Sequence, residues 1–236
     1  MWAFLTLDLA DTSVGILSEN CDPANIAPKE PGRVEKRMPK ISAPTVAEHR
    51  ARQRTALLRA ATDILVTDGI GAVTPAAVGA AAGLARPSVY QYFPSAAAII
   101  AAIIEDVFPR ANQILADALA SASTPRERLD TYIRETLRLA AEGYHRPASA
   151  LAGATLPAEC AARLIDLHRE QATPFLEALS ELGVPDLPLT APLLGGIIDA
   201  GMTMVEAGQS LDAVTERTTA LIHAASTPAP SKASSH

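Results

Sequence analysis

Apolar residues recur at the spacing of an α-helix over most of the chain from about Val46 onward. In the first such segment, positions i, i+4, i+7 and i+8 form one apolar stripe, made of Leu57, Ala61, Ile64 and Leu65. Gly69 and Gly71 are predicted to end this helix, because glycine is common just beyond a helix end. The sequence has no alternation of strand period, so the pattern predicts an all-α fold.

Two short helices are predicted to follow. Thr74 and Pro75 have the residue types of an N-cap and a first helical position. Gly83 would break the second helix, and a third helix is expected from about Arg86 to Phe93. Two short helices joined by a tight, glycine-containing turn are typical of a helix-turn-helix, although alanine-rich hairpins also occur in plain bundles. Small residues would let the two helices approach closely: Gly79, Ala80, Ala82 and Gly83.

Six further helices are expected after Pro94 and Ser95, which gives about nine in all. Turn signals such as Thr124-Pro125 and Leu156-Pro157 separate them, and we place them near 95–120, 125–143, 147–154, 157–182, 189–207 and 211–225. The expected organisation is a disordered N-terminal extension over 1–44, a helix-turn-helix domain over 45–94, a helical domain over 95–226 and a disordered tail over 227–236.

The N-terminal extension is rich in proline and shows no helical period. Met38 opens an ordinary-looking start, so we hypothesise that residues 1–37 are absent from the natural protein. Peptides from before Met38 in a mass spectrum of the natural protein would refute this hypothesis.

Charge is divided unevenly along the chain. The net charge of −6 over 236 residues argues against a nucleic-acid partner. Residues 33–93, however, contain nine Lys and Arg against four acids, a net charge of +5, which leaves −11 for the other residues. A basic segment joined to an acidic body is consistent with one end that meets a polyanion. A solvated basic helix face is an equally good explanation of the charge alone.

Cysteines and apolar runs indicate the compartment. Cys21 and Cys160 have no metal-ligand spacing and are not expected to form a disulfide, so we expect a cytoplasmic protein. The N-terminus lacks the basic start and unbroken apolar run of a secretory signal. No stretch approaches the ~20 apolar residues that span a bilayer, so no membrane partner is expected. We expect no cofactor and no metal, since His145 and His168 have no third ligand at a useful spacing.

The segment TPAAVGAAAGLARPSVYQYFPS (74–95) resembles the DNA-binding helix-turn-helix of the TetR family of bacterial regulators. The similarity begins in the preceding helix, RTALLRAATDILVTDGIGAVT (54–74), and covers about 50 residues; the rest of the chain is similar only in layout. The resemblance implies an all-helical ligand-binding and dimerisation domain after the helix-turn-helix. It also implies a homodimer that binds near-palindromic operator DNA, most often as a repressor, and is released by a small-molecule effector.

The resemblance assigns roles to residues of the third helix and its surroundings. Val89 and Phe93 lie four apart and should face inward. Base contacts are expected from Arg86, Pro87, Ser88 and Gln91, because Arg and Gln match the edges of guanine and adenine. Phosphate contacts are expected from Thr74, Tyr90, Tyr92 and Ser95. The alternative for this segment is a tyrosine-rich packing corner.

Two positions depart from the family pattern. Members usually have Ser or Thr where Ala85 stands, so the third helix lacks a cap worth about 1 kcal/mol. Many also have Lys where Ala96 stands, so one phosphate contact is expected to be missing.

The C-terminal domain should provide a dimer interface and an effector pocket. In the family the last two long helices pair with their copies, which assigns the interface to Leu194, Ile197, Ile198, Gly201 and Val205, unless this is an internal core helix. The polar pocket candidates are Tyr132, Tyr144, His145 and His168, with Arg146 and Arg169 beside them. Each could equally be a surface residue or the partner of another side chain.

Two other classes of function compete with a DNA-binding regulator. A helical-bundle enzyme would need a nucleophile and base, paired carboxylates or a phosphate loop, and the sequence shows no such arrangement. A helical interaction module that does not bind DNA would use the basic stretch only as a solvated face.

Overall fold

The computed structural model describes residues 43–226, and every regular element within them is helical, as expected. Most of the expected segments 1–44 and 227–236, with Met38 and Cys21, lie outside the described residues; Ala43 already begins the first helix. The elements in order are α1 (Ala43–Asp68), the 3₁₀ helix η2 (Ile70–Ala72), α2 (Pro75–Ala81), α3 (Arg86–Val89), α4 (Ala96–Leu119), α5 (Pro125–Ala141), α6 (Arg146–Leu151), α7 (Ala158–Glu181), α8 (Leu187–Glu206) and α9 (Leu211–Ser226).

Hydroxyl side chains fix three of the helix starts. The Thr74 hydroxyl oxygen accepts from the amide of Ala77 at the start of α2, and Ser95 accepts from Ala98 at the start of α4. Thr124 caps α5 and forms a capping box with Glu127, whose carboxylate accepts from the Thr124 amide. These bonds satisfy amides that have no partner inside their helix.

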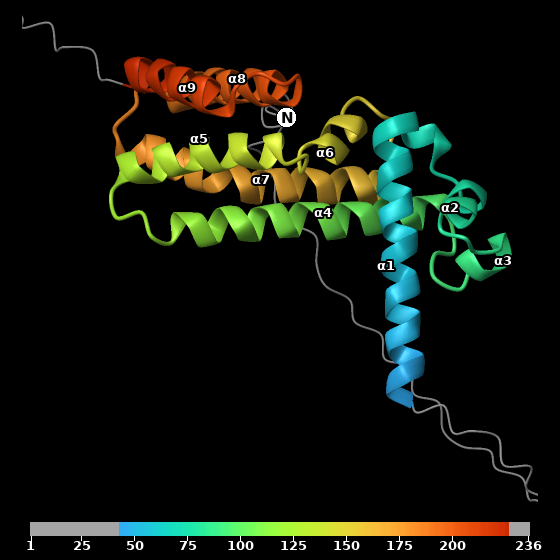
Figure 1. Ribbon diagram of the computed structural model, residues 1–236. Helices are drawn as coiled ribbons and strands as arrows, with labels where there is room; N and C mark the ends of the chain where they lie inside the picture. The colour runs from blue at the N-terminus through green and yellow to red at the C-terminus, as the bar shows by residue number, and fades with distance from the viewer. Residues whose placement is uncertain (1–42, 227–236) are drawn as a thin grey trace, which may run out of the picture.

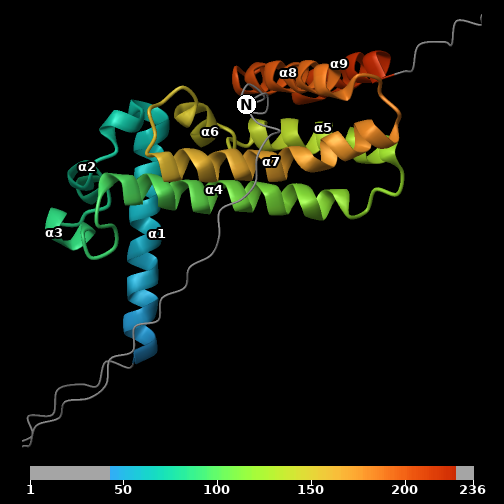
Figure 2. The ribbon, with the colours of Figure 1, turned by 180° about the vertical axis from the view of Figure 1, so that it is seen from behind.

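The helices form a layered body with a smaller head at one end. In both ribbon views α8 and α9 cover α5 and α7, and α4 lies on the far side of α7 (Figure 1, Figure 2). The long helix α1 crosses the end of α4, with α2 and α3 beside it, and its N-terminal half extends away from the body (Figure 1).

Two hydrophobic cores hold the chain together. One joins the head to the near end of the body, and it contains Leu57, Val78 and Val89 together with Leu151 of α6 and Leu164 of α7. The other fills the far part of the body between α5, α7, α8 and α9, around side chains such as Phe175. Because α4, α6 and α7 contribute to the head core, the head is packed onto the body, with no free linker at residues 94–95.

Helix α8 is long and apolar enough to cross a membrane by length and composition. In the bundle the buried face of α8 packs on α5 and α9, so its apolar residues serve the protein core. The helices approach so closely that a Cβ on Gly201 would lie 2.9 Å from Cδ2 of Leu137 and 3.0 Å from Oγ1 of Thr218. The small residue that the sequence assigned to a subunit interface therefore serves contacts inside the protomer.

Candidate functional site

Close packing of α2 against the turn before α3 builds the helix-turn-helix. Gly79 is buried, and a Cβ there would lie 2.8 Å from both the Leu84 carbonyl oxygen and Cγ2 of Val89. Gly83 has φ +70°, a conformation that glycine adopts without strain. The expected role of small residues at this crossing is confirmed.

The inward and outward faces of α3 are as predicted. Val89 and Phe93 are buried in the head core, with 0 % and 3 % exposure. Arg86, Pro87 and Gln91 are exposed, and Ser88 is half-buried. Nη2 of Arg86 donates to the hydroxyl oxygen of the exposed Tyr90 at 3.1 Å, so one polar pair stands on the outer face.

Regular helix ends earlier than the sequence predicted. The expected helix ran to Phe93, but α3 ends at Val89 and the chain continues in tight turns. Gln91 and Tyr92 donate to the carbonyls of Ser88 and Val89, three residues back, which is the tighter 3₁₀ pattern. Ala85 at the N-cap supplies no side-chain bond, in agreement with the missing cap.

Three side chains of α1 hold the turn after α3. The hydroxyl of Tyr92 donates to Oε1 of Gln53 at 2.5 Å. Nη2 of Arg50 donates to the carbonyl of Gln91 at 3.3 Å, and its guanidinium carbon lies 5.7 Å from the Tyr92 ring centroid. The guanidinium of Arg54 lies 5.5 Å from the ring centroid of Phe93. The sequence offered Arg50 and Arg54 only as phosphate contacts or a solvated face; Gln53 was missed, although its spacing places it on the same face.

The hydroxyl of Tyr92 has a partner inside the head. A phosphate oxygen accepts hydrogen bonds and does not donate them, so a phosphate contact would need the tyrosine O–H. In Tyr92 that O–H is already donated to Gln53, and the residue is half-buried. Tyr90 is exposed and accepts from Arg86, which leaves its own O–H for a phosphate.

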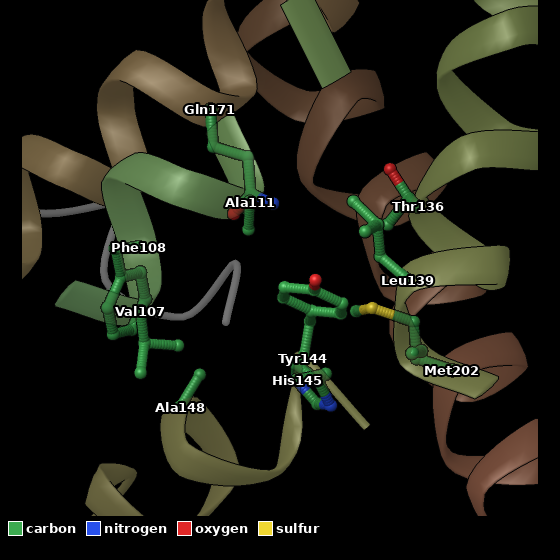
Figure 3. A pocket seen from close by; sticks show the side chains of 11 residues that line it. Val107, Phe108, Ala111, Thr136, Leu139, Tyr144, His145, Ala148, Gln171 and Met202 are labelled. Carbon is green, nitrogen blue, oxygen red and sulfur yellow. The ribbon is translucent and has the colours of Figure 1, made fainter. Parts of the chain in front are cut away.

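A cavity of about 30 Å³ lies between α4, α5, α6 and α8. Figure 3 shows the ring of Tyr144 in its middle, between Val107 and Phe108 on one side and Met202 on the other. The polar groups among its lining residues are few: Thr136, Tyr144, His145 and Gln171. A mostly apolar chamber with a few polar groups is typical of a small-molecule site.

Two more cavities adjoin the first. The second, about 160 Å³, shares His145 and Ala148 with it and is also lined by Asp199 and Thr203. The third, about 90 Å³, shares His168 and Leu164 with the second, and the rest of its lining is largely apolar. Helix α6 contributes to all three, and its other contacts include α1 of the head.

The structure brings three of the four predicted pocket residues together. Tyr144, His145 and His168 line these cavities. Tyr132 does not: it is 1 % exposed and packs on Phe175, with ring centroids 5.3 Å apart. Its burial, with the nearby charge of Asp199, raises the pKa of the Tyr132 hydroxyl well above its usual value.

The two histidines of the cavities have different surroundings. Nδ1 of His145 lies 3.2 Å from a carboxylate oxygen of Glu206. His168 is 7 % exposed and stands edge-on to Phe108, with ring centroids 5.1 Å apart. Burial is the main cause that lowers the pKa of His168 to about 4; His145 adds a smaller effect in the same direction, and the Leu164 carbonyl has a weaker opposite effect. Outside the cavities, Arg146 is exposed and Arg169 pairs with Asp166. Within residues 43–226 no three His, Cys, Asp or Glu side chains are grouped to hold a metal ion.

The residues assigned to a dimer interface are mostly internal. Leu194, Ile198, Gly201 and Val205 are buried in the protomer, and only Ile197 is partly exposed. The apolar surface of α8 and α9 consists of other residues: Leu189, Leu193, Met204 and Leu221 are each 48–65 % exposed. A groove of about 250 Å³ between the two helices, lined by Ile197, Met204 and Leu221 among others, continues this surface.

The chain is similar to known proteins in two ways, by a family model over part of its sequence and by its fold. The family model for bacterial regulatory proteins of the tetR family matches residues 57–103, from α1 through the helix-turn-helix into α4. No curated protein sequence is significantly similar to the chain.

Solved structures match over most of the chain. A TetR-like transcriptional regulator from Rhodococcus sp. RHA1 is 24 % identical, with TM-score 0.60, covering 73 % of this chain and 94 % of its own. AibR, solved with isovaleryl coenzyme A and operator DNA, is 15 % identical with TM-score 0.61, and the match covers 72 % of this chain and 97 % of AibR. The superantigen PfiT is 24 % identical with TM-score 0.62, and the match covers 72 % of this chain and 95 % of PfiT.

These structures establish the fold, and the family model identifies the helix-turn-helix within residues 57–103. A superantigen with the same fold shows that the fold alone does not decide function. The family model matches the segment that the structure builds as a helix-turn-helix, with α2 capped by Thr74 and packed closely at Gly79. Residues 57–103 of the chain are therefore similar to the helix-turn-helix of tetR-family bacterial regulatory proteins, and the chain as a whole has the fold of the TetR-like regulators that have been solved.

Proposed function

We propose that the protein is a homodimeric repressor that binds a near-palindromic operator and releases it when a small molecule occupies the body. The match of the head to the tetR-family model supports a DNA-binding regulator rather than an enzyme. The observation that carries the finer proposal is the exposed polar face of α3, with Arg86 and Gln91 outward and Val89 and Phe93 anchoring it from behind.

Base recognition would come from this outer face. Arg86 can bond O6 and N7 of guanine, and Gln91 can bond N6 and N7 of adenine. Ser88 and Pro87 would complete the contact surface in the major groove. Arg86 would leave its bond to Tyr90 on binding, since the same guanidinium serves both.

Phosphate contacts would position the head. Thr74 and Ser95 cap α2 and α4, so they sit where helix N-termini favour an anion. Tyr90 is also exposed and would add a third phosphate contact. We assign Tyr92 to positioning, because Gln53 takes its O–H.

The dimer would form through the exposed apolar residues of α8 and α9. Four of the six exposed large apolar side chains of the described residues lie on these two helices: Leu189, Leu193, Met204 and Leu221. An apolar surface of this kind is typical of a subunit interface. A two-fold interface of these helices would present two heads to one face of DNA, as a palindromic operator requires.

The effector would bind in the connected cavities. AibR, which has the same fold, was solved with an acyl-coenzyme A and with operator DNA. In this chain α6 lies between cavities and head, because Ala148 and Ser149 line cavity walls while Leu151 enters the head core. A ligand that binds more tightly when α6 is shifted from its present position would favour a conformation of the dimer in which the two heads are arranged differently. The protein would act in the cytoplasm, where the DNA is.

Selection of random duplex DNA by the purified full chain tests this function. We expect an enriched near-palindrome with two half-sites about one helical turn apart. Arg86→Ala and Gln91→Ala should each weaken the enrichment and remove the preference at one position of the half-site, whereas Arg134→Ala, which removes one exposed charge from α5, should leave it unchanged. A pool that shows no preferred sequence would favour an interaction module that does not recognise DNA sequence.

A further inference from the structure

His168 is a buried polar side chain that makes no well-formed hydrogen bond, although the Leu164 carbonyl one turn earlier on α7 acts weakly on it. It is 7 % exposed, and neither Nδ1 nor Nε2 has a partner within hydrogen-bond geometry in the described part of the chain. An unsatisfied buried polar group is costly, so natural proteins rarely keep one without a use. The edge-on contact with Phe108 holds the imidazole in place.

The imidazole stands at the junction of two cavities. The second cavity, on one side, carries polar groups from Asp199, Thr203 and Ser149. The third, on the other, is walled by Leu151, Leu156 and Ile165. A ligand bonded to His168 could therefore place its polar group among polar neighbours and its apolar part in the third cavity.

A second buried polar group belongs to the wall of the first cavity. Thr136 is 2 % exposed and lines that cavity, and its hydroxyl acts on the Tyr132 hydroxyl without a hydrogen bond of good geometry. The walls of the adjoining cavities thus contain two buried, uncharged hydrogen-bonding side chains.

The charges around the cavities do not suit an anion. Among the described residues that line the three cavities there is no lysine or arginine, whereas Asp199 is acidic. At the neighbouring surface hollow next to Tyr144, Asp106 and Glu142 outnumber Arg110, which itself pairs with Asp106 at 3.4 Å. A buried carboxylate or phosphate would lose its hydration here without gaining a cation.

We infer that the effector is an uncharged molecule with an apolar portion and one hydroxyl or carbonyl group, and that this group hydrogen-bonds to His168. The inference rests on the proposed function and specifies its ligand. It separates this protein from structural neighbours whose ligands carry phosphates, such as AibR with isovaleryl coenzyme A. The neutral imidazole can donate from one nitrogen and accept at the other, so it serves a hydroxyl or a carbonyl equally well.

Isothermal titration calorimetry of the full chain at pH 7.4 tests the ligand class with three probes that share one tail: octan-1-ol, octanoate and octylammonium. We expect octan-1-ol to bind at least about tenfold more tightly than either ion, since only the ions lose a charge's hydration. Octanoate or octylammonium binding as tightly as the alcohol, or no binding of the alcohol, would overturn the inference.

Variants of His168 test the contact. His168→Leu should weaken octan-1-ol about five- to tenfold, as expected for the loss of one hydrogen bond. It should leave the affinity for 1-chlorooctane, which has no hydroxyl, unchanged. His168→Gln keeps a donor and an acceptor and should stay within about threefold of the parent. Thermal unfolding shows that each variant is folded, and equal affinities of the parent and His168→Leu for the alcohol would refute the contact.

Operator binding by the same samples separates this inference from the proposed function. If the protein selects a palindrome but does not bind octan-1-ol, the inference fails and the regulator stands. If it binds the alcohol through His168 but selects no DNA sequence, the ligand site stands and the regulator fails.

Discussion

The hydroxyl of Tyr92 and Oε1 of Gln53 are joined by a 2.5 Å hydrogen bond that ties the turn after α3 to the middle of α1. With Arg50 over the Tyr92 ring and Arg54 over the Phe93 ring, this bond makes α1 a support for the DNA-facing turn. The basic residues of α1 thus have a structural role that their charge alone does not indicate.

The Tyr92–Gln53 bond should contribute to stability. Tyr92→Phe and Gln53→Leu are each expected to lower the free energy of unfolding by about 1 kcal/mol, and the double variant by less than their sum, because both remove one bond. Urea unfolding measures the cycle. Tyr90→Phe, on the exposed face, is the control and should weaken operator binding with little change in stability. Strictly additive losses would show that the two side chains are not coupled.

A cap on α3 is missing and can be restored. Ala85 has the extended backbone of an N-cap, with φ −65° and ψ 142°, but no side-chain acceptor. Ala85→Ser should therefore raise the free energy of unfolding by up to about 1 kcal/mol. Ala85→Val, which adds bulk without an acceptor, should give no such gain. If serine and valine behave alike in thermal unfolding, the end of α3 does not limit the stability of the head.

Local signals predicted the head well. Thr74 and Ser95 cap helices whose starts depend on the adjacent residues, and Gly79 and Gly83 meet requirements of the tight turn itself. The early end of α3 was missed because Val89 and Phe93 keep helical spacing while the backbone between them tightens.

Which apolar residues of α5 and α8 are buried depends on tertiary packing, and the sequence pattern alone did not determine it. Leu193 and Leu194 are neighbours on an apolar helix, and only contacts with α5 and α9 determine that Leu194 is internal and Leu193 exposed. Tyr132 was taken as a polar pocket residue, although Leu129, Ile133 and Leu137 mark its stripe on α5 as a core face. The prediction rested on the hydroxyl of Tyr132 and neglected its ring, which belongs to the apolar face of α5.

Stability should depend on pH through His168. Burial lowers its pKa from 6.5 to about 4. Between these two pKa values the unfolded chain binds more protons than the folded one. The contribution of His168 to the free energy of unfolding is therefore fully present above pH 6.5 and is lost as the pH falls toward 4, by about 3 kcal/mol in all. Urea unfolding at pH 7.5 and 4.5 measures it for the parent and for His168→Gln. A fall of the same size in both would show that carboxylates, and not His168, cause the pH dependence.

The exposed apolar residues of α8 should control the oligomeric state. Leu193 is 65 % exposed, and Leu193→Glu would place a charge in the proposed interface. We expect a dimer for the parent in sedimentation equilibrium and a shift to monomer for the variant. Val46→Glu alters a 54 % exposed apolar residue of α1 and should leave the dimer intact. A monomeric parent at micromolar concentration would contradict the proposed interface.

The central claim is that Arg86 and Gln91 recognise bases, and titration of the selected duplex and of single base-pair variants tests it most directly. We predict that Arg86→Ala costs about 1–3 kcal/mol on the selected duplex and removes the preference at one guanine in each half-site, while the other positions remain selective. A uniform loss on all duplexes would make Arg86 a phosphate contact. No loss on any duplex would contradict DNA recognition by α3.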